Sequence, residues 1–244
     1  MNNTFYDVAI NLGSAVLFFL LGIFVQYIIR VWRQRGKRAI WKLLNNGKDL
    51  SIALTTRDGP ELTSSPRATF DEVLALTGAF SILQQMPIKY SLIDDNETFR
   101  VNPAVNILSI GGEKANKISS RIWNEYSQNL PVRIERDPYS VVIGEKRYTT
   151  EYADDEKRIV ADYGVVLVVC TRDSLGKTVC RMVAFGLRGF GTRGAVQSIS
   201  SREMIKRFRR HSKTDSFVAV VRITENNEEI RSTVEEFYPL DSYQ

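Results

Sequence analysis

Two glycine-rich segments, a first loop at residues 109–116 and a second loop at residues 186–194, carry the residue types that could bind a phosphate. Each follows an apolar run that predicts a strand and precedes a predicted helix, so backbone N–H groups at a helix N-terminus would point toward a ligand. Glycine lets the backbone approach a phosphate closely, and nearby Lys and Arg side chains would supply positive charge. Thr192 could also cap its helix. The predicted ligand-binding residues are Gly111, Gly112, Glu113, Lys114, Asn116, Arg188, Gly189, Gly191, Thr192 and Arg193.

Ordinary tight turns would explain the same glycines. Neither segment ends in the GK[ST] of a P-loop, and the run GLRGFGTRG over residues 186–194 does not fit G-x-G-x-x-G. No clear acidic partner for a ribose follows about 20 residues later. Both interpretations therefore stay open. We expect a nucleotide-type or other anionic ligand and no cofactor.

Candidate catalytic residues are sparse. His211 stands at the end of a basic helix in RFRRHSK, where a histidine stabilises the helix C-terminus more readily than it acts as a base. Glu113, Asp162 and Asp173 lie near loops, and a glycosidic reaction could use one carboxylate as nucleophile and another as acid. Their spacing does not select them over solvated carboxylates. The sequence favours a non-enzymatic protein, with Glu113 and Asp162 as the catalytic candidates if it is an enzyme.

The cysteine and histidine content excludes two classes of site. Two cysteines and one histidine are too few for a zinc site or a disulfide scaffold, so no metal is expected. Cys170 and Cys180 stand at nearly mirrored positions about a turn at 173–176, so they could face each other across a hairpin. We expect them to be buried thiols.

Alternating strand and helix patterns position the two glycine-rich segments. Thr69 and Glu72 form a capping-box pattern ahead of an amphipathic helix, and Gly164–Cys170 (GVVLVVC) is the strongest strand pattern. The pattern predicts an α/β fold, a Rossmann-like three-layer α/β domain with antiparallel additions. Strands are predicted at 51–56, 88–93, 105–110, 132–135, 140–143, 164–170 and 178–185, a final hairpin at 217–223 and 230–237, and helices at 70–86, 115–129 and 194–208.

Positive charge is concentrated in one short segment. The chain has 33 Lys and Arg against 28 Asp and Glu. Residues 30–48 hold seven of the basic residues and no acidic residue, so the acidic and basic residues of 49–244 nearly balance. A body near neutrality has no global field to attract a polyanion, and we expect no binding to a DNA or RNA duplex.

The run Ala9–Ile29 is free of charged residues over 21 positions. A helix of that length would cover about 30 Å, the hydrocarbon thickness of a bilayer. The basic residues follow the run, which disfavours a cleaved signal peptide. They also place the following body in the cytoplasm. The sequence therefore predicts a single-pass protein of the inner membrane, with its N-terminus outside.

One face of this predicted helix is small and polar. Its members fall within about 120° of one another on a helical wheel. Small residues permit close helix approach in lipid, and side-chain amides form interhelical hydrogen bonds. We therefore expect self-association into a homo-oligomer through this stripe, although such small residues are common in any spanning helix. The residues are Asn11, Ser14, Ala15, Gly22 and Gln26.

Three parts are expected along the chain: a transmembrane helix with a short external N-terminus at 1–32, a polybasic juxtamembrane linker at 33–48 and a cytosolic domain at 49–244. The linker would lie against anionic membrane lipid, with Trp41, Leu43 and Leu44 reaching into the interface, or would simply be solvated.

This layout, with the loops GGEKAN and GLRGFGTRG, resembles the single-pass membrane effectors of bacterial antiphage nucleotide signalling, namely CRISPR-associated CARF-type and CBASS-like membrane proteins. The resemblance implies a sensor that binds a cyclic nucleotide or oligonucleotide at a dimer interface, and helices that assemble to disrupt the membrane. Two alternatives remain. One is a membrane-tethered nucleoside deoxyribosyltransferase-like or NAD-cleaving enzyme that uses Glu113 or Asp162, and the other is a scaffold that binds only proteins.

Overall fold

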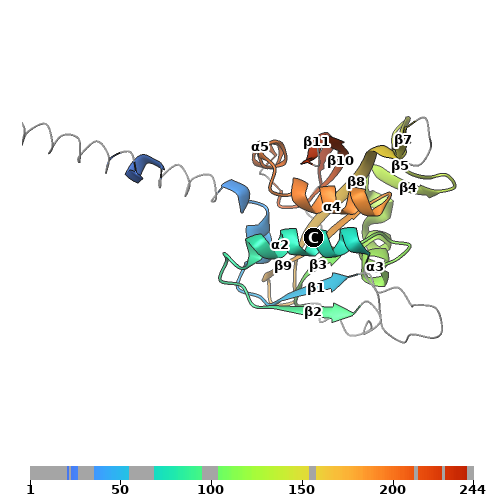
Figure 1. Ribbon diagram of the computed structural model, residues 1–244. Coiled ribbons are helices and arrows are strands. Elements are labelled where there is room, and N and C mark those ends of the chain that lie inside the picture. The colour runs from blue at the N-terminus through green and yellow to red at the C-terminus, as the bar shows by residue number, and fades with distance from the viewer. Residues whose placement is uncertain are drawn as a thin grey trace, which may run out of the picture.

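The domain is a mixed α/β structure built on one eight-stranded sheet (Figure 1). This computed structural model describes residues 21, 23–26, 36–54, 69–94, 104–153, 158–211, 214–226 and 229–240. Seven strands follow the order β11-β10-β8-β9-β3-β1-β2, and β7 pairs with β8 beside this path. A separate small sheet has the order β4-β5-β6.

One half of the main sheet is parallel. β1 (Leu50–Leu54) pairs in parallel with β2 (Tyr90–Asp94) and β3 (Asn106–Ile110), and β3 pairs in parallel with β9 (Thr178–Gly186). The helix α2 (Phe70–Leu83) connects β1 to β2, and the predicted capping box at its start is confirmed. Because the strands run the same way, their carboxyl ends all emerge at one edge of the sheet.

The other half is an antiparallel meander. β8 (Ile159–Arg172) pairs antiparallel with β9 and with β10 (Phe217–Asn226), and β10 pairs antiparallel with β11 (Glu229–Pro239). β7 (Glu151–Tyr152) adds a short antiparallel partner to β8. The predicted final hairpin is confirmed.

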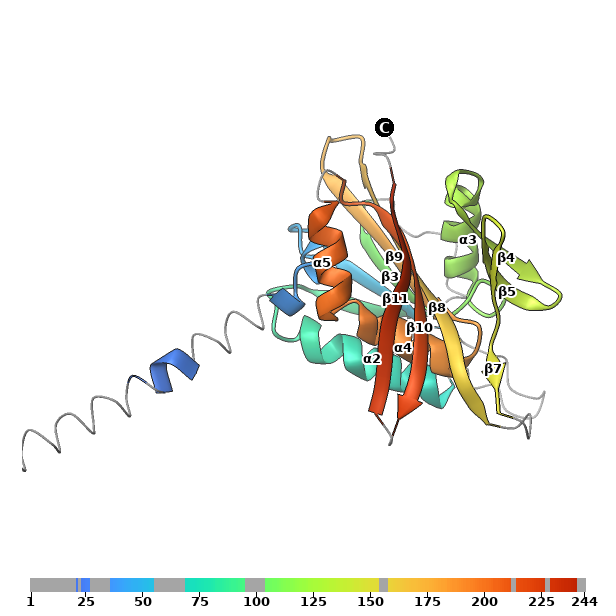
Figure 2. The same ribbon diagram turned by 90° about the horizontal axis from the view of Figure 1, so that it is seen from above.

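Two apolar cores lie on opposite faces of the sheet. Alternate residues of a strand point to opposite faces, and Val166 and Val168 join one core while Val165 and Leu167 join the other. The helices α2, α4 (Gly189–Ser198) and α5 (Arg202–Arg210) cover the first face. Figure 2 shows these three helices on one side of the sheet and α3 with β4 and β5 on the other.

The second face is covered by α3 (Lys117–Tyr126) and the small sheet. Trp123 of α3 packs edge-on against Phe185 of β9, with ring centroids 5.6 Å apart. The 3-10 turn η3 (Ser127–Asn129) follows α3 and leads into β4 (Val132–Arg136), β5 (Tyr139–Ile143) and β6 (Lys146–Tyr148). Both sheet faces are therefore covered, which explains the long apolar runs of β8 and β9.

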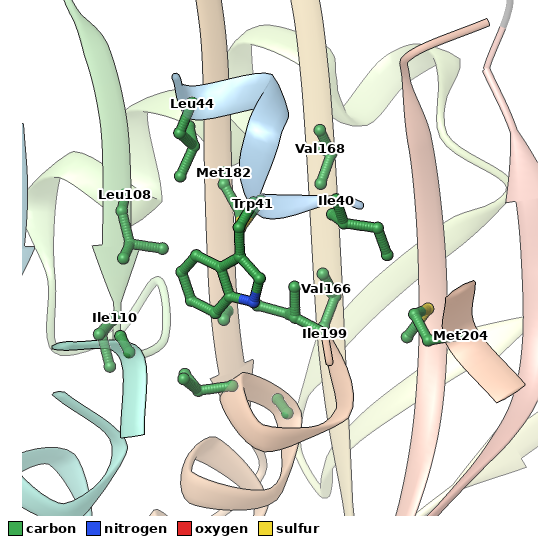
Figure 3. Packing of buried hydrophobic residues seen from close by; sticks show 14 of the residues in the cluster. Ile40, Trp41, Leu44, Leu108, Ile110, Val166, Val168, Met182, Ile199 and Met204 are labelled. Carbon is green, nitrogen blue, oxygen red and sulfur yellow. The ribbon is translucent and has the colours of Figure 1, made fainter. Parts of the chain in front are cut away.

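Residues 40–44, which the sequence analysis assigns to a linker, belong to the core. The 3-10 turn η1 (Trp41–Leu44) and the preceding Ile40 have three side chains with no solvent exposure: Ile40, Trp41 and Leu44. Figure 3 shows them packed among Val166, Val168, Met182 and Ile199. Trp41 and Leu44 therefore cannot reach a membrane interface from this position, because the sheet and helices of the same chain already surround them.

The predicted fold class is wrong in its transmembrane helix. Over the described residues, the structure contains no helix that is both long enough and apolar enough to cross a bilayer. Most of the expected span at 9–29 lies outside the described residues. Of that span the structure describes Leu21 and residues 23–26, which are helical.

Two local expectations also need correction. The predicted helix at 194–208 is two helices, because α4 begins earlier, at Gly189, and Ser201 starts α5 by accepting a hydrogen bond from the Met204 N–H at 3.1 Å. Cys170 and Cys180 do face each other across the β8–β9 ladder. They are joined in a disulfide, so the expectation of free thiols is wrong.

An ion pair joins β7 to β10 within the main sheet and gives the fold a pH dependence. The Glu151 carboxylate accepts hydrogen bonds from Arg222 Nη2 at 2.8 Å and from the Tyr163 hydroxyl at 2.8 Å. The bonds from Arg222, and then from Tyr163, hold the pKa of Glu151 below its usual 4.5, although burial opposes them. A lowered pKa in the folded state stabilises the fold above the unfolded pKa, and that stability is lost as the pH falls through the folded value.

Between about pH 6 and about pH 3, we expect the free energy of unfolding to fall less in Glu151→Gln than in the unmodified chain. The effect should stay below about 1 kcal/mol because both partners are partly exposed. Urea denaturation at a series of pH values measures it. Glu229→Gln, which changes an exposed carboxyl on β11, is the matched control and should leave the slope unchanged. An unaltered slope in Glu151→Gln would contradict this assignment.

Candidate functional site

The two predicted ligand loops lie side by side at the carboxyl edge of the parallel strands. β3 and β9 are neighbours, with Ile110 opposite Ala184. The N–H of Gly111 donates to the carbonyl of Ala184 at 3.0 Å, just where both strands end. The fold therefore brings together two segments that are about 75 residues apart in the sequence.

A carboxylate of the chain itself occupies the N-terminus of α4. Asp162 of β8 has no solvent exposure. Its Oδ2 accepts hydrogen bonds from the backbone N–H groups of Arg188 at 3.0 Å and Gly191 at 2.7 Å, and its Oδ1 accepts one from the Thr150 hydroxyl at 2.8 Å. Burial raises the pKa of Asp162, and these hydrogen bonds oppose the rise. The N–H groups that were expected to receive an anionic ligand thus already have an internal anion.

Close packing accounts for the glycines of the second loop. A Cβ on Gly186 would overlap the backbone of Gly191 and Thr192, and one on Gly194 would overlap the Ile223 side chain of β10. The Thr192 hydroxyl accepts a hydrogen bond from the Gly186 N–H at 2.9 Å inside the protein. These glycines let α4 lie directly against the sheet.

The first loop is likewise internally bonded. Gly111 has a φ of 113°, which favours glycine. The buried Asn116 caps α3 by accepting from the N–H groups of Ile118 at 2.9 Å and Ser119 at 3.0 Å, and it donates to the Ile110 carbonyl at 3.1 Å. Asn116 therefore uses its side chain to hold the β3–α3 junction.

Glu113 and Asp162, the two catalytic candidates, both lie near the partly buried Tyr139. Burial, followed by the nearby Glu113 and then Asp162, raises the pKa of Tyr139 to about 12. The side chain of Glu113 is only 7% exposed and accepts from Arg136 Nη2 at 3.0 Å. Lys114 Nζ lies 4.0 Å from the centroid of the Tyr139 ring. Both carboxylates are thus engaged in hydrogen bonds with groups of the protein itself.

Of the two cations in the second loop, Arg188 is exposed, whereas Arg193 lies near another carboxylate. Gly189 packs against Asp71 at the start of α2, whose carboxyl lies where a Cβ on that glycine would be. Burial raises the pKa of Asp71, and the nearby Arg193 opposes this. Arg193 is half-buried, and within the described residues its Nε has no hydrogen-bond partner. Arg193 is therefore placed to neutralise Asp71.

Other predicted residues are placed as follows. His211 ends α5, with its N–H bonded to the carbonyls of Arg207 and Phe208, and its ring stacks on Phe237 at 5.6 Å. Gln26 is helical and exposed, whereas Asn11, Ser14, Ala15 and Gly22 lie outside the described residues. The expected self-association stripe stays a prediction.

A cavity lined by described residues lies elsewhere, on the exposed side of α5. Met204 and Ile205 of α5 are buried, which fixes the orientation of the helix. Helical spacing then places four exposed cations along the cavity, and a fifth comes from the segment before η1. These cations are Arg202, Lys206, Arg209, Arg210 and Lys37.

We call this cavity the basic cleft. Its volume is about 860 Å³, within the range of small-molecule sites. Gly36, Ser200 and Ile205 complete its lining, so no carboxylate and no aromatic ring lines it among the described residues. Arg207 points away and pairs with Glu203 at 2.8 Å. The five lining cations are therefore concentrated without a carboxylate among them.

Sequence reasoning missed the basic cleft. Its two signals, the basic run at 30–48 and the basic helix ending in RFRRHSK, are both visible in the sequence. They are more than 150 residues apart, and no local pattern shows that they meet. The comparisons add no family: no protein-family model matches the chain, and no curated protein matches its sequence. The resemblance to antiphage membrane effectors therefore stays a prediction.

Proposed function

We propose that this protein is a non-enzymatic receptor that binds a small, phosphate-bearing ligand in the basic cleft. The observation that carries the proposal is a cavity of about 860 Å³ lined by five cations and, among the described residues, by no carboxylate. Crowded like charges are unfavourable unless an anion joins them. Guanidinium groups bind phosphates through two parallel hydrogen bonds, and three of the five cations are arginines.

The lining selects phosphate groups and does not select a base. Recognition of a nucleobase uses aromatic stacking and paired donors and acceptors. The described lining offers charged donors, the Ser200 hydroxyl and the aliphatic Ile205. A nucleotide-type signal, which the sequence analysis expects, is one source of clustered phosphates, and an anionic lipid headgroup is another. Both share the chemistry that this cleft recognises.

The internal bonding of Glu113 and Asp162 disfavours the enzymatic alternative. A carboxylate nucleophile or general acid must reach the reacting atoms of a substrate. Asp162 has no exposed surface and is bonded to backbone N–H groups, while Glu113 is paired with Arg136. Asp162 attaches the second loop to β8, and Glu113 attaches the first loop to β4, so the proposal assigns them no catalytic step.

Isothermal titration calorimetry of the full chain with inorganic triphosphate tests this function. We expect binding that weakens steeply between about 0.05 M and about 0.5 M salt, because screening reduces the attraction between exposed charges. ATP should bind about as tightly as inorganic triphosphate, because the described lining of the cleft has no aromatic ring that could stack on the adenine base. The double variant Arg209→Gln and Arg210→Gln should weaken binding by about 30-fold, because each arginine loses a charge-assisted bond.

The matched control is Arg121→Gln with Lys177→Gln, which removes two exposed cations from other parts of the domain. It should leave the affinity within about twofold, because distant exposed charges are screened. A competition with phosphatidylglycerol vesicles distinguishes a lipid source from a soluble one. Failure of triphosphate to bind, or equal weakening in the control, would contradict the proposal.

A further inference from the structure

The basic cleft is formed by two segments that are far apart in the sequence. One wall is α5 with the preceding Ser200. The other wall is Gly36 and Lys37, which we call the neck because they precede the first buried residues of the domain. A ligand in the basic cleft therefore lies between the body of the domain and the point where the N-terminal part of the chain joins it.

The chain is held firmly just after the neck. Arg38 donates from Nη2 to Gln85 Oε1 at 2.6 Å, and Trp41 donates from Nε1 to Ser200 Oγ at 2.9 Å. Ile40 has no exposure. Lys37 itself is exposed. The position of the neck is thus fixed on its C-terminal side by the core. Its cationic side chain shares the cleft with four of the five cations of α5.

Electrostatics makes the neck responsive to a ligand. Without an anion, Lys37 is repelled by the row of cations on α5, because the described lining contains no carboxylate to offset them. A phosphate-bearing ligand attracts both walls at once. Such a ligand binds the closed arrangement more tightly than an open one, and this differential affinity is what allows it to shift a conformational equilibrium.

We propose that a phosphate-bearing ligand clamps the neck against α5 and so couples occupancy of the basic cleft to the position of Gly36 and Lys37. This inference rests on the proposed function and adds how binding is transmitted. The coupling acts through Lys37, because Lys37 supplies the cation on the wall of the neck.

One backbone hydrogen bond reports directly on the neck. The Ala39 N–H donates to the Gly36 carbonyl at 3.1 Å, so holding Gly36 in place protects the Ala39 amide from exchange. The Lys42 N–H, which donates to the Arg38 carbonyl at 2.9 Å, lies in the anchored part and serves as an internal reference.

Hydrogen exchange of the full chain, with and without saturating inorganic triphosphate, tests the clamp. We expect exchange at Ala39 to slow by about tenfold and exchange at Lys42 to change by less than about twofold. Lys37→Gln should still bind triphosphate through α5, more weakly, but should lose the protection of Ala39 at saturation. Calorimetry on the same samples records binding separately.

The outcomes separate the two proposals. Triphosphate binding without slower exchange at Ala39 would overturn the clamp and leave the proposed function intact. Equal protection in Lys37→Gln and in the unmodified chain would also overturn it, because the protection would not pass through that cation. Absence of binding by calorimetry would remove both proposals.

Discussion

Replacing Trp41 with alanine should lower the free energy of unfolding by about 3–5 kcal/mol, the cost of deleting a large buried aromatic side chain. Trp41 has no solvent exposure and packs against the sheet and the α4–α5 turn (Figure 3). The same substitution removes the bond from the indole N–H to Ser200. Urea denaturation of the full chain, followed by circular dichroism, measures the change.

Trp41→Phe is the matched variant. It keeps most of the apolar contact and loses the indole hydrogen bond, so it should cost only about 1–2 kcal/mol. If Trp41→Ala changed the free energy of unfolding by less than about 1 kcal/mol, residues 40–44 would behave as the linker that the sequence suggests. For the same reason, a fragment that begins at residue 49 should be much less stable than the full chain.

Replacing Asp162 with alanine should lower the free energy of unfolding by about 3 kcal/mol, because it leaves one buried and one partly buried N–H group without an acceptor. Those groups belong to Arg188 and Gly191 at the start of α4. The loss also removes the partner of the Thr150 hydroxyl. Thermal and urea unfolding of the purified variant measure the effect.

Asp162→Asn is the control for charge. Its amide oxygen can still accept from the α4 N–H groups, and its NH₂ can donate to the Thr150 oxygen, so we expect a cost of about 1 kcal/mol. Replacement of a catalytic carboxylate has a different effect. Because functional sites often store strain, such a replacement does not lower the free energy of unfolding. A stable Asp162→Ala variant would therefore reopen the enzymatic interpretation.

Local patterns predicted much of the secondary structure. The capping box of Thr69 and Glu72 and the run GVVLVVC depend on neighbours within a few residues, and both were confirmed. The break between α4 and α5 was missed because Ser201 lies inside a run whose apolar spacing looks continuous. The mirrored positions of Cys170 and Cys180 correctly indicated that the two residues face each other. The spacing alone does not show whether they form a disulfide, which they do.

The candidate site was less predictable because it depends on distant neighbours. Glycines that let α4 approach the sheet have the same sequence signature as glycines that let a backbone approach a phosphate. The two roles are distinguished by distant residues. Asp162 lies against Gly191 and Ile223 lies against Gly194, and each pair is 29 residues apart in the sequence. The basic cleft likewise joins Lys37 to α5 through the tertiary fold alone.

A crystal structure of the full chain with inorganic triphosphate tests the central claim most directly. We predict triphosphate density between Lys37 and the cationic side of α5, with Asp162 still bonded to the start of α4. Triphosphate bound instead at the glycine-rich loops, with Asp162 displaced from Arg188 and Gly191, would contradict the account.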